Sequence, residues 1–180
     1  MKREFAPYLN PIFIETGSYI GMGIDAALEA GFKKIISIEV NDYFYQICKE
    51  KYSHQERVEI RFGDSILILP KVLEKINQRC TFWLDGHYMS DPRTEGGMMP
   101  VPLMEELKII KQHTIKNHTI LIDDIRLLRN HEAEWADLPY DVCDVEQFIY
   151  SINPNYKITY TFGEVENDIL IAEVNECFCN

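Results

Sequence analysis

Residues 11–23 read P-I-F-I-E-T-G-S-Y-I-G-M-G, an apolar run that ends in a carboxylate and continues into a glycine-rich turn. The apolar residues at 12–14 are too few for a helix and suit a strand that is buried on both faces. From residue 21 to residue 30, apolar side chains recur at helical spacing, and Gly31 follows as a C-terminal stop signal. A strand, a glycine-rich turn and a helix are typical of nucleotide-binding proteins, because glycines allow a ligand close to the backbone and a helix N-terminus offers free N–H groups.

The composition of the whole chain predicts a single intracellular domain. A length of 180 residues, of which 46% are hydrophobic, suits one domain over residues 1–180 and excludes a disordered chain. The net charge of −11 argues against nucleic acids and anionic membranes as partners and favours small molecules. Since the chain has no membrane-spanning apolar run and no signal-peptide core, we expect a cytoplasmic protein. Five cysteines without zinc-ligand spacing fit a reducing compartment, and metal binding by Cys177 and Cys179 is a less favoured alternative.

Alternating strands and helices are predicted along the rest of the chain. After the first strand and helix, we expect strands at residues 34–40, 58–62, 80–85, 119–124, 157–162 and 169–174. Helices are expected at residues 41–52, 66–76, 103–112, 131–138 and 144–152, with Asn41 and Ser65 as N-caps. Residues 163–168 are short enough to join the last two strands as an antiparallel hairpin. Five strand–helix units and a closing hairpin predict an α/β fold with a doubly wound sheet.

Two templates compete for the glycine-rich turn. Residues 21–26, G-M-G-I-D-A, match the dinucleotide fingerprint G-x-G-x-x-G/A, but Gly21 lies six positions after Glu15, whereas the first glycine of that fingerprint directly follows its strand. Residues 15–23 instead read E-x-G-x-x-x-G-x-G, which resembles motif I of the class I S-adenosylmethionine-dependent methyltransferases. The resemblance implies a Rossmann-like sheet in the order 3-2-1-4-5-7-6 with strand 7 antiparallel. It also implies that the cofactor's methionine end lies against the turn, at Glu15, Thr16, Gly17, Ser18 and Gly21.

Acidic residues at the ends of the next two strands fit the rest of a nucleotide. Glu39 ends the second strand, where a carboxylate can accept both hydroxyls of a ribose, although this does not separate S-adenosylmethionine from NAD. A surface carboxylate is the alternative. Asp64 and Ser65 follow the third strand, at the position where the resemblance implies contacts to the adenine, with a simple capping acid as the alternative for Asp64.

Three aspartates at the ends of the fourth and fifth strands predict a cation site. Asp85 ends one strand and the pair Asp123 and Asp124 ends the next, so three oxygen donors converge on one edge of the sheet. Such donors suit Mg²⁺, Mn²⁺ or Ca²⁺, and a solvated turn or helix cap is the alternative for the aspartate pair. The set looks like the ligands of Mg²⁺-dependent O-methyltransferases, and Asp followed by Asp-Asp is closest to the macrocin-type and novobiocin-type sugar O-methyltransferases. In that group an acid two residues after the first ligand is the general base, and here His87 takes this position.

The resemblance therefore implies an enzyme that transfers a methyl group from S-adenosylmethionine to a hydroxyl group of a sugar, a catechol-like phenol or a small glycan precursor. Asp85, Asp123 and Asp124 would hold the metal, and His87 would remove the proton. Candidates for substrate contacts are Tyr88, Arg93, Arg126 and Arg129, the arginines for a phosphate or carboxylate, with a plain surface position as the alternative for each. Residues 89–101 are expected to form an active-site lid.

Two other classes of function stay open. An NAD-dependent oxidoreductase or epimerase would use the fingerprint at residues 21–26 together with Glu39. A non-catalytic protein of methyltransferase fold would explain why only about ten residues precede the first strand, where related enzymes carry covering helices. The same short segment favours a homo-oligomer in which a second subunit closes the site.

Overall fold

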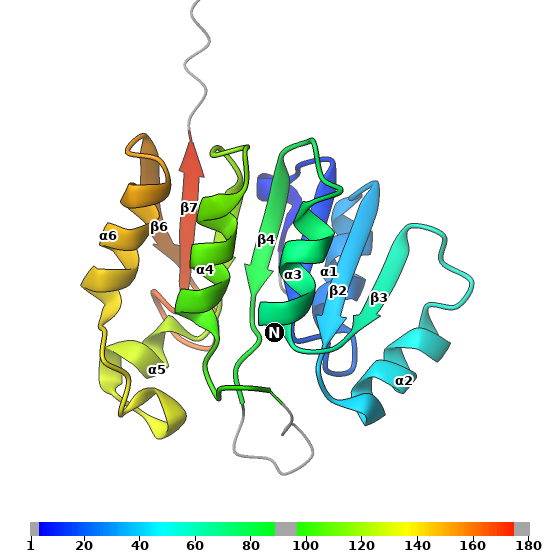
Figure 1. Ribbon diagram of the computed structural model, residues 1–180, viewed down its shortest axis with the longest axis horizontal. Coiled ribbons are helices and arrows are strands. Elements are labelled where there is room, and N and C mark those ends of the chain that lie inside the picture. The colour runs from blue at the N-terminus through cyan, green and yellow to red at the C-terminus, as the bar shows by residue number, and fades with distance from the viewer. Residues whose placement is uncertain (1–3, 89–96, 175–180) are drawn as a thin grey trace, which may run out of the picture.

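A seven-stranded sheet with helices on both faces accounts for residues 4–88 and 97–174, the parts of the chain that the computed structural model describes (Figure 1). The strand order is β3-β2-β1-β4-β5-β7-β6, and β7 runs antiparallel to both of its neighbours. This order and this direction confirm the sheet that the sequence resemblance implies. The strands are β1 Ile12–Thr16, β2 Lys34–Glu39, β3 Val58–Phe62, β4 Cys80–Leu84, β5 Thr119–Ile122, β6 Tyr156–Thr161 and β7 Ile169–Val174.

The helices form two layers around this sheet. In Figure 1, α3, α4 and α6 lie side by side on one face, and α1 covers the other. The bounds are η1 Ala6–Tyr8, α1 Met22–Ala30, α2 Asp42–Lys51, α3 Ser65–Leu73, α4 Leu103–Gln112, α5 Ile125–Asn130, η3 Ala133–Trp135 and α6 Val142–Ile152.

Alternation along the central strands divides the core into two clusters. On β4, Phe82 joins the cluster under α3, α4 and α6, whereas the next residue, Trp83, joins the cluster under α1. Phe5 of the N-terminal segment also belongs to the second cluster, with its ring centroid 5.0 Å from that of Trp83. Because both faces are covered, the central strands are mostly apolar, as the short apolar runs of the sequence predict.

One predicted helix is wrong and one predicted cap is displaced. No α-helix forms at residues 131–138, because α5 begins directly after β5 and ends where His131 takes a left-handed φ of 54°. Ile125 and Leu128 give α5 its buried face, whereas the following residues form only a 3₁₀ turn. Ser65 is the first helical residue of α3 rather than its N-cap, because the carboxylate of Asp64 accepts the Ile66 N–H at 2.9 Å.

Buried polar groups at the amino end of the parallel strands pair with one another. The Cys80 N–H donates to Nδ1 of His118 at 3.0 Å, so the proton of His118 lies on Nε2 and points to Nδ1 of His113, 2.9 Å away. Nε2 of His113 then donates to the carbonyl of Ile76. Burial lowers the pKa of His118 to about 3, which keeps the ring neutral. Nearby, the amide nitrogen of Asn10 lies within 3.3 Å of acceptors on β4 and β5.

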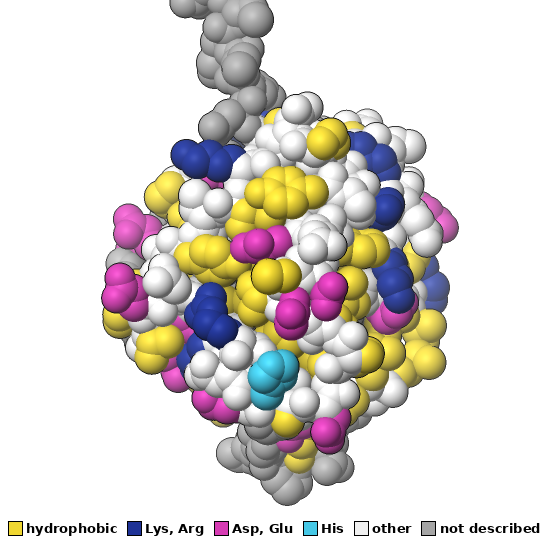
Figure 2. Space-filling view, turned by 90° about the vertical axis from the view of Figure 1, so that its left-hand side faces the viewer, with side chains coloured by type: hydrophobic (Ala, Val, Ile, Leu, Met, Phe, Trp, Pro, Cys, Tyr) yellow, Lys and Arg dark blue, Asp and Glu magenta, His cyan; other side chains and the backbone are white. Residues whose placement is uncertain are grey.

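The outer surface at the β6 edge is mixed in character. Figure 2 shows hydrophobic, acidic and basic side chains interspersed on this face, with the basic ones in small groups. Within the described ranges, every helix is too short or too polar to cross a lipid bilayer.

Candidate active site

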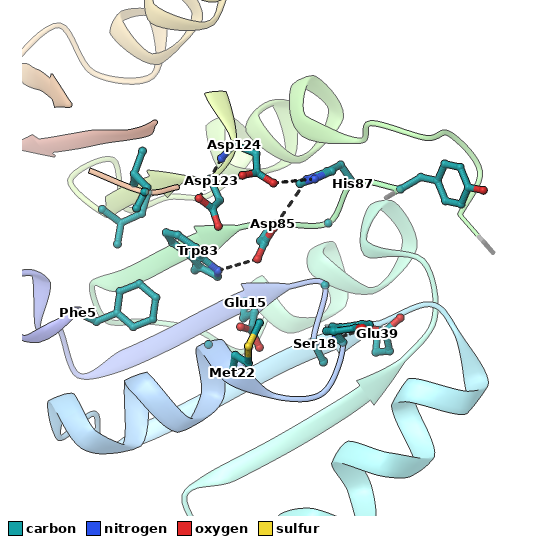
Figure 3. Close-up of a pocket in the computed structure, with 18 of the residues that line it drawn as sticks. Phe5, Glu15, Ser18, Met22, Glu39, Trp83, Asp85, His87, Asp123 and Asp124 are labelled. Carbon is teal, nitrogen blue, oxygen red and sulfur yellow. Dashed lines mark hydrogen bonds and ion pairs between the residues drawn. The ribbon is translucent and has the colours of Figure 1, made fainter. Parts of the chain in front are cut away.

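A cavity of about 1000 Å³ opens at the carboxyl edge of the parallel strands (Figure 3). Three groups of side chains line it. The first is built around Glu15 and Glu39, near the ends of β1 and β2, and the second consists of Asp85, His87, Asp123 and Asp124, after β4 and β5. The third is apolar and consists of Phe5, Tyr8, Trp83, Leu121, Phe162 and Ile169. In Figure 3 the titratable group lies between Phe5 and Trp83 on one side and Glu39 on the other.

Two glycines, Gly17 in the turn after β1 and Gly23 in α1, allow the backbone to pack closely against its neighbours. Gly17 has a φ of +83°, and a Cβ there would lie 2.3 Å from the carbonyl oxygen of Asp85. A Cβ on Gly23 would lie 1.8 Å from Oε1 of Glu15. These glycines therefore let the turn, β4 and the first helix approach one another closely, which brings Glu15 and Asp85 to the same cavity.

A hydrogen-bonded chain holds Glu15 in place. The Ser37 hydroxyl donates to Oε2 of Glu15, and the Ser18 hydroxyl lies 2.5 Å from that of Ser37, to which it donates in turn. Glu15 is only 1% exposed, although it lines the cavity. The sequence shows the signal for this arrangement, since Ser37 interrupts an otherwise apolar strand.

Glu39 is also buried and oriented by the backbone. Its two carboxylate oxygens accept the N–H groups of Tyr19 at 2.9 Å and Asn41 at 2.8 Å. Burial raises the pKa of Glu39, against the lowering effect of these hydrogen bonds. Glu39 also lines the cavity, where its carboxylate lies within reach of a ligand hydroxyl.

Four of the predicted cofactor-binding residues do not line the cavity. Thr16 is fully buried, and the Tyr52 hydroxyl donates to the carbonyl of Gly21 at 2.7 Å. Asp64 and Ser65 begin α3, and Oδ2 of Asp64 accepts the Met98 N–H at 2.6 Å. An adenine contact by Asp64 therefore stays a prediction, as does the role of Ser65.

Asp85, His87 and Asp124 bring their ligand atoms within 4.8 Å of one another. Nε2 of His87 lies 3.1 Å from Oδ2 of Asp124, and Nδ1 lies 3.8 Å from Oδ1 of Asp85. A second group joins Asp123 and Asp124 to Asp168. The predicted set of Asp85, Asp123 and Asp124 is thus divided, because His87 replaces Asp123 beside the other two.

The side chain of Arg126 lies at the second of these carboxylate clusters. Arg126 pairs with Asp124, with Asp168 at 2.7 Å and with Glu164 at 2.8 Å. Arg126, predicted as a substrate contact, is therefore held by carboxylates. Arg129 donates to the carbonyl of Asn167, whereas Arg93 lies outside the described residues, as do 89–96 of the predicted lid and the cysteines of the tail.

The charges of this cluster favour ionised forms. Burial lowers the pKa of His87, but the hydrogen bond to Asp124 and the charges of Asp85, Asp124 and Asp123 together raise it above the usual value. Burial raises the pKa of Asp124, and His87 and Arg126 more than compensate and hold it below its usual range. His87 and Asp124 therefore form a charged pair when no ligand is bound.

The set Asp85, His87 and Asp124 fits a divalent cation. Two carboxylates and an imidazole are ligands that Mn²⁺ and Zn²⁺ accept, whereas Mg²⁺ prefers oxygen alone. Asp124 also has a φ of 55°, in the left-handed region. A strained backbone of this kind is found at functional sites more often than elsewhere.

Sequence reasoning missed two buried residues beside this cluster. The indole N–H of Trp83 lies 3.3 Å from Oδ2 of Asp85, to which it donates. Glu106 on α4 is 1% exposed, and burial raises its pKa to about 7. The helical spacing of Leu103, Glu106 and Ile110 places Glu106 on the apolar face of its helix, so the sequence pattern itself indicates that this residue is buried.

Solved structures of O-methyltransferases have this fold. TomG of Streptomyces achromogenes, in complex with S-adenosylmethionine, is 14% identical over 95% of this chain and 76% of its own, with a TM-score of 0.59. An O-methyltransferase of Bacillus cereus with bound S-adenosylhomocysteine is 15% identical over 95% and 77%, with a TM-score of 0.60. A Staphylococcus aureus protein described as a caffeoyl-CoA O-methyltransferase is 14% identical over 95% and 79%, with a TM-score of 0.56.

No protein-family model and no curated protein sequence matches the chain. The structural likeness, at these low identities, therefore shows the fold and leaves the macrocin-type and novobiocin-type subgroup as a prediction.

Proposed function

We propose that this protein transfers a methyl group from S-adenosylmethionine to a hydroxyl oxygen of a small molecule. The observation that carries the proposal is the cavity itself, in which Glu15 and Glu39 share one space with Asp85, His87 and Asp124 in a methyltransferase fold. S-adenosylmethionine, when bound, supplies a methyl group on a positively charged sulfur.

The cofactor would lie along the ends of β1 and β2. The oxygens of Glu39 would accept the two ribose hydroxyls, because the backbone already orients the carboxylate. Gly17 and Asp85 both line the cavity, and the methionine part of the cofactor would lie beside them. Glu15, held by Ser37, would face the ammonium group of the cofactor.

His87 would remove the proton of the acceptor hydroxyl. Its Nε2–H donates to Asp124, which leaves Nδ1 as the nitrogen that accepts a proton when the ring is neutral. Since the ring must lose its proton first, we expect kcat/KM to rise with pH through the pKa of His87. A pH profile that does not depend on His87 would exclude it as the base.

A divalent cation would be held by Asp85 and Asp124, the two residues shared by the predicted and the observed sets. It would supply Lewis acidity that lowers the pKa of the acceptor hydroxyl. A cation that also took Nδ1 of His87 would prevent proton transfer at that atom. Assays with EDTA and with added Mg²⁺ or Mn²⁺ test this assignment, and full activity in EDTA would exclude the metal.

Calorimetric titration with S-adenosylhomocysteine, with NAD⁺ in parallel, tests the cofactor. We expect S-adenosylhomocysteine to bind and NAD⁺ not to bind. The substitution Glu39→Gln should weaken that binding by about tenfold, since a charged hydrogen-bond acceptor is lost. Glu59→Gln on the outer strand β3 is the matched control. Binding of NAD⁺ alone would favour the oxidoreductase or epimerase, and binding of neither would favour the non-catalytic protein.

A further inference from the structure

The part of the cavity beyond Asp85 has apolar walls. Phe5 and Trp83 pack edge to face there, and Leu121 and Ile169 complete the wall. Figure 3 shows Phe5 and Trp83 on the side of Asp85 that faces away from Glu39. Phe162, at the end of the hairpin, is 56% exposed and borders the same space. A flat apolar ring can be buried here, whereas a sugar would bring several hydroxyl groups against walls that offer few hydrogen-bond partners.

The charged side chains that line the cavity are almost all acidic. Among the described residues that line it, none is lysine or arginine, and the single histidine is His87. Seven carboxylates line it: Glu4, Glu15, Glu39, Asp85, Asp123, Asp124 and Glu164. The neighbouring guanidinium of Arg126 is not free to bind an anion, since three carboxylates hold it.

A negatively charged acceptor would therefore meet repulsion, and no described lysine or arginine of the lining would compensate it. A divalent cation and a positively charged cofactor would still leave an excess of negative charge around the acceptor. Phosphate groups are bound in proteins by arginine, lysine or helix N-termini, and the described lining offers no basic side chain for them. The Staphylococcus aureus neighbour is described as acting on a coenzyme A ester, which carries phosphates, so this chain departs from that acceptor class.

We infer that the acceptor is a hydroxylated aromatic molecule that carries no negative charge and is either neutral or positively charged. This inference rests on the proposed function and adds the acceptor class to it. The apolar wall binds the ring, and the excess of carboxylates in the described lining favours a positive substituent over a negative one.

Three catechols of similar size test the inference directly: dopamine, 4-methylcatechol and 3,4-dihydroxybenzoate. They carry a positive, a neutral and a negative substituent, and each has the same pair of hydroxyl groups. We expect kcat/KM to be at least about tenfold higher for dopamine and for 4-methylcatechol than for 3,4-dihydroxybenzoate, because like charges repel in a partly buried site. Methyl transfer is measured by mass spectrometry with and without Mg²⁺.

A pair of variants at Phe162 separates charge from shape. Phe162→Lys adds a cation to the rim without removing an ion pair, and Phe162→Met is the control that changes shape alone. The ratio of kcat/KM for 4-methylcatechol to kcat/KM for 3,4-dihydroxybenzoate should be about fivefold smaller in the lysine variant than in the methionine variant. An unchanged preference would contradict a role for charge.

The remaining outcomes distinguish this inference from the proposed function. Equal or faster transfer to 3,4-dihydroxybenzoate would overturn the inference and leave the methyltransferase proposal intact. Binding of S-adenosylhomocysteine without methylation of any of the three catechols would overturn the aromatic acceptor. If S-adenosylhomocysteine does not bind and no transfer occurs, the proposed function itself fails.

Discussion

Buried polar groups are arranged differently at the two ends of the parallel strands. At the amino end, His118, His113 and Asn10 find partners in the strands and in each other. At the carboxyl end, carboxylates gather on one cavity, and the described cationic side chains that pair with them are His87 and Arg126. The first arrangement stabilises the fold, and the second keeps unfavourable charge where a cationic ligand can compensate it.

The largest test of this contrast is Asp85→Asn at the carboxyl end. We expect kcat/KM for methyl transfer to fall by about a thousandfold, because the substitution removes a proposed metal ligand and a negative charge beside His87. The free energy of unfolding should stay within about 1 kcal/mol of the original or rise, since one repulsive charge is removed. Steady-state assays and urea denaturation measure the two quantities. A large loss of stability would show that Asp85 serves the fold.

The amino end should make the protein sensitive to acid through His118. Its pKa is about 3 in the folded protein and near 6.5 when unfolded, so the unfolded state binds the extra proton between these values. Stability is therefore expected to fall below pH 6.5 by up to about 1.4 kcal/mol per pH unit. His118→Gln should reduce this slope, and His54→Gln, on the exposed surface, should not. Urea denaturation at several pH values measures the slope, and equal slopes in all three proteins would contradict the assignment.

The carboxyl end should show the opposite dependence through Glu106. Burial raises its folded pKa to about 7, above the ordinary glutamate value of 4.5, so the folded state retains the extra proton. This contribution to stability is complete below pH 4.5 and is lost as the pH rises through 7. Glu106→Gln should remove the loss and stabilise the protein at pH 8 by up to about 3 kcal/mol. Glu105→Gln, one residue earlier, is the control. A stability at pH 8 that is the same in both variants would show that Glu106 is already ionised at little cost.

The smallest expected effect belongs to Asn10. Asn10→Ala removes hydrogen bonds to Thr81 and Thr119 and should lower the free energy of unfolding by about 1–2 kcal/mol. Activity should be unchanged, because the side chain lies at the end of the sheet away from the cavity. Thermal denaturation measures the loss of stability, and Asn155→Ala, at an exposed position, is the control. If Asn10→Ala loses activity under conditions in which the protein is fully folded, the amino and carboxyl ends of the strands are coupled.

The sequence predicted the layout of the site better than its contacts. Parallel strands end at one edge, so the positions of Glu15, Glu39 and Asp85 near one another followed from where each strand ends. The strand order could be stated because the turn at residues 15–23 resembles a known motif, and the structure confirms it.

The sequence did not predict which acids meet. Asp123 and Asp124 are adjacent, and the left-handed backbone of Asp124 decides which of them reaches His87. Arg126 was a candidate for substrate contact because it follows the aspartate pair. Its partners Glu164 and Asp168 lie about forty residues further along the chain, so the sequence did not show the pairing. Phe5 lies outside any predicted element, and its place in the cavity wall depends on packing against Trp83.

The pairing of Arg126 has a consequence for changing what this protein acts upon. One guanidinium links Asp124, beside the proposed base, to Glu164 and Asp168 in the loop that borders the acceptor space. A redesigned loop at residues 163–168 would remove two partners of Arg126 and alter the surroundings of Asp124 at the same time. We therefore expect loop exchanges that broaden acceptor choice to change kcat together with KM, so that selection for a new acceptor would also act on the rate of the reaction.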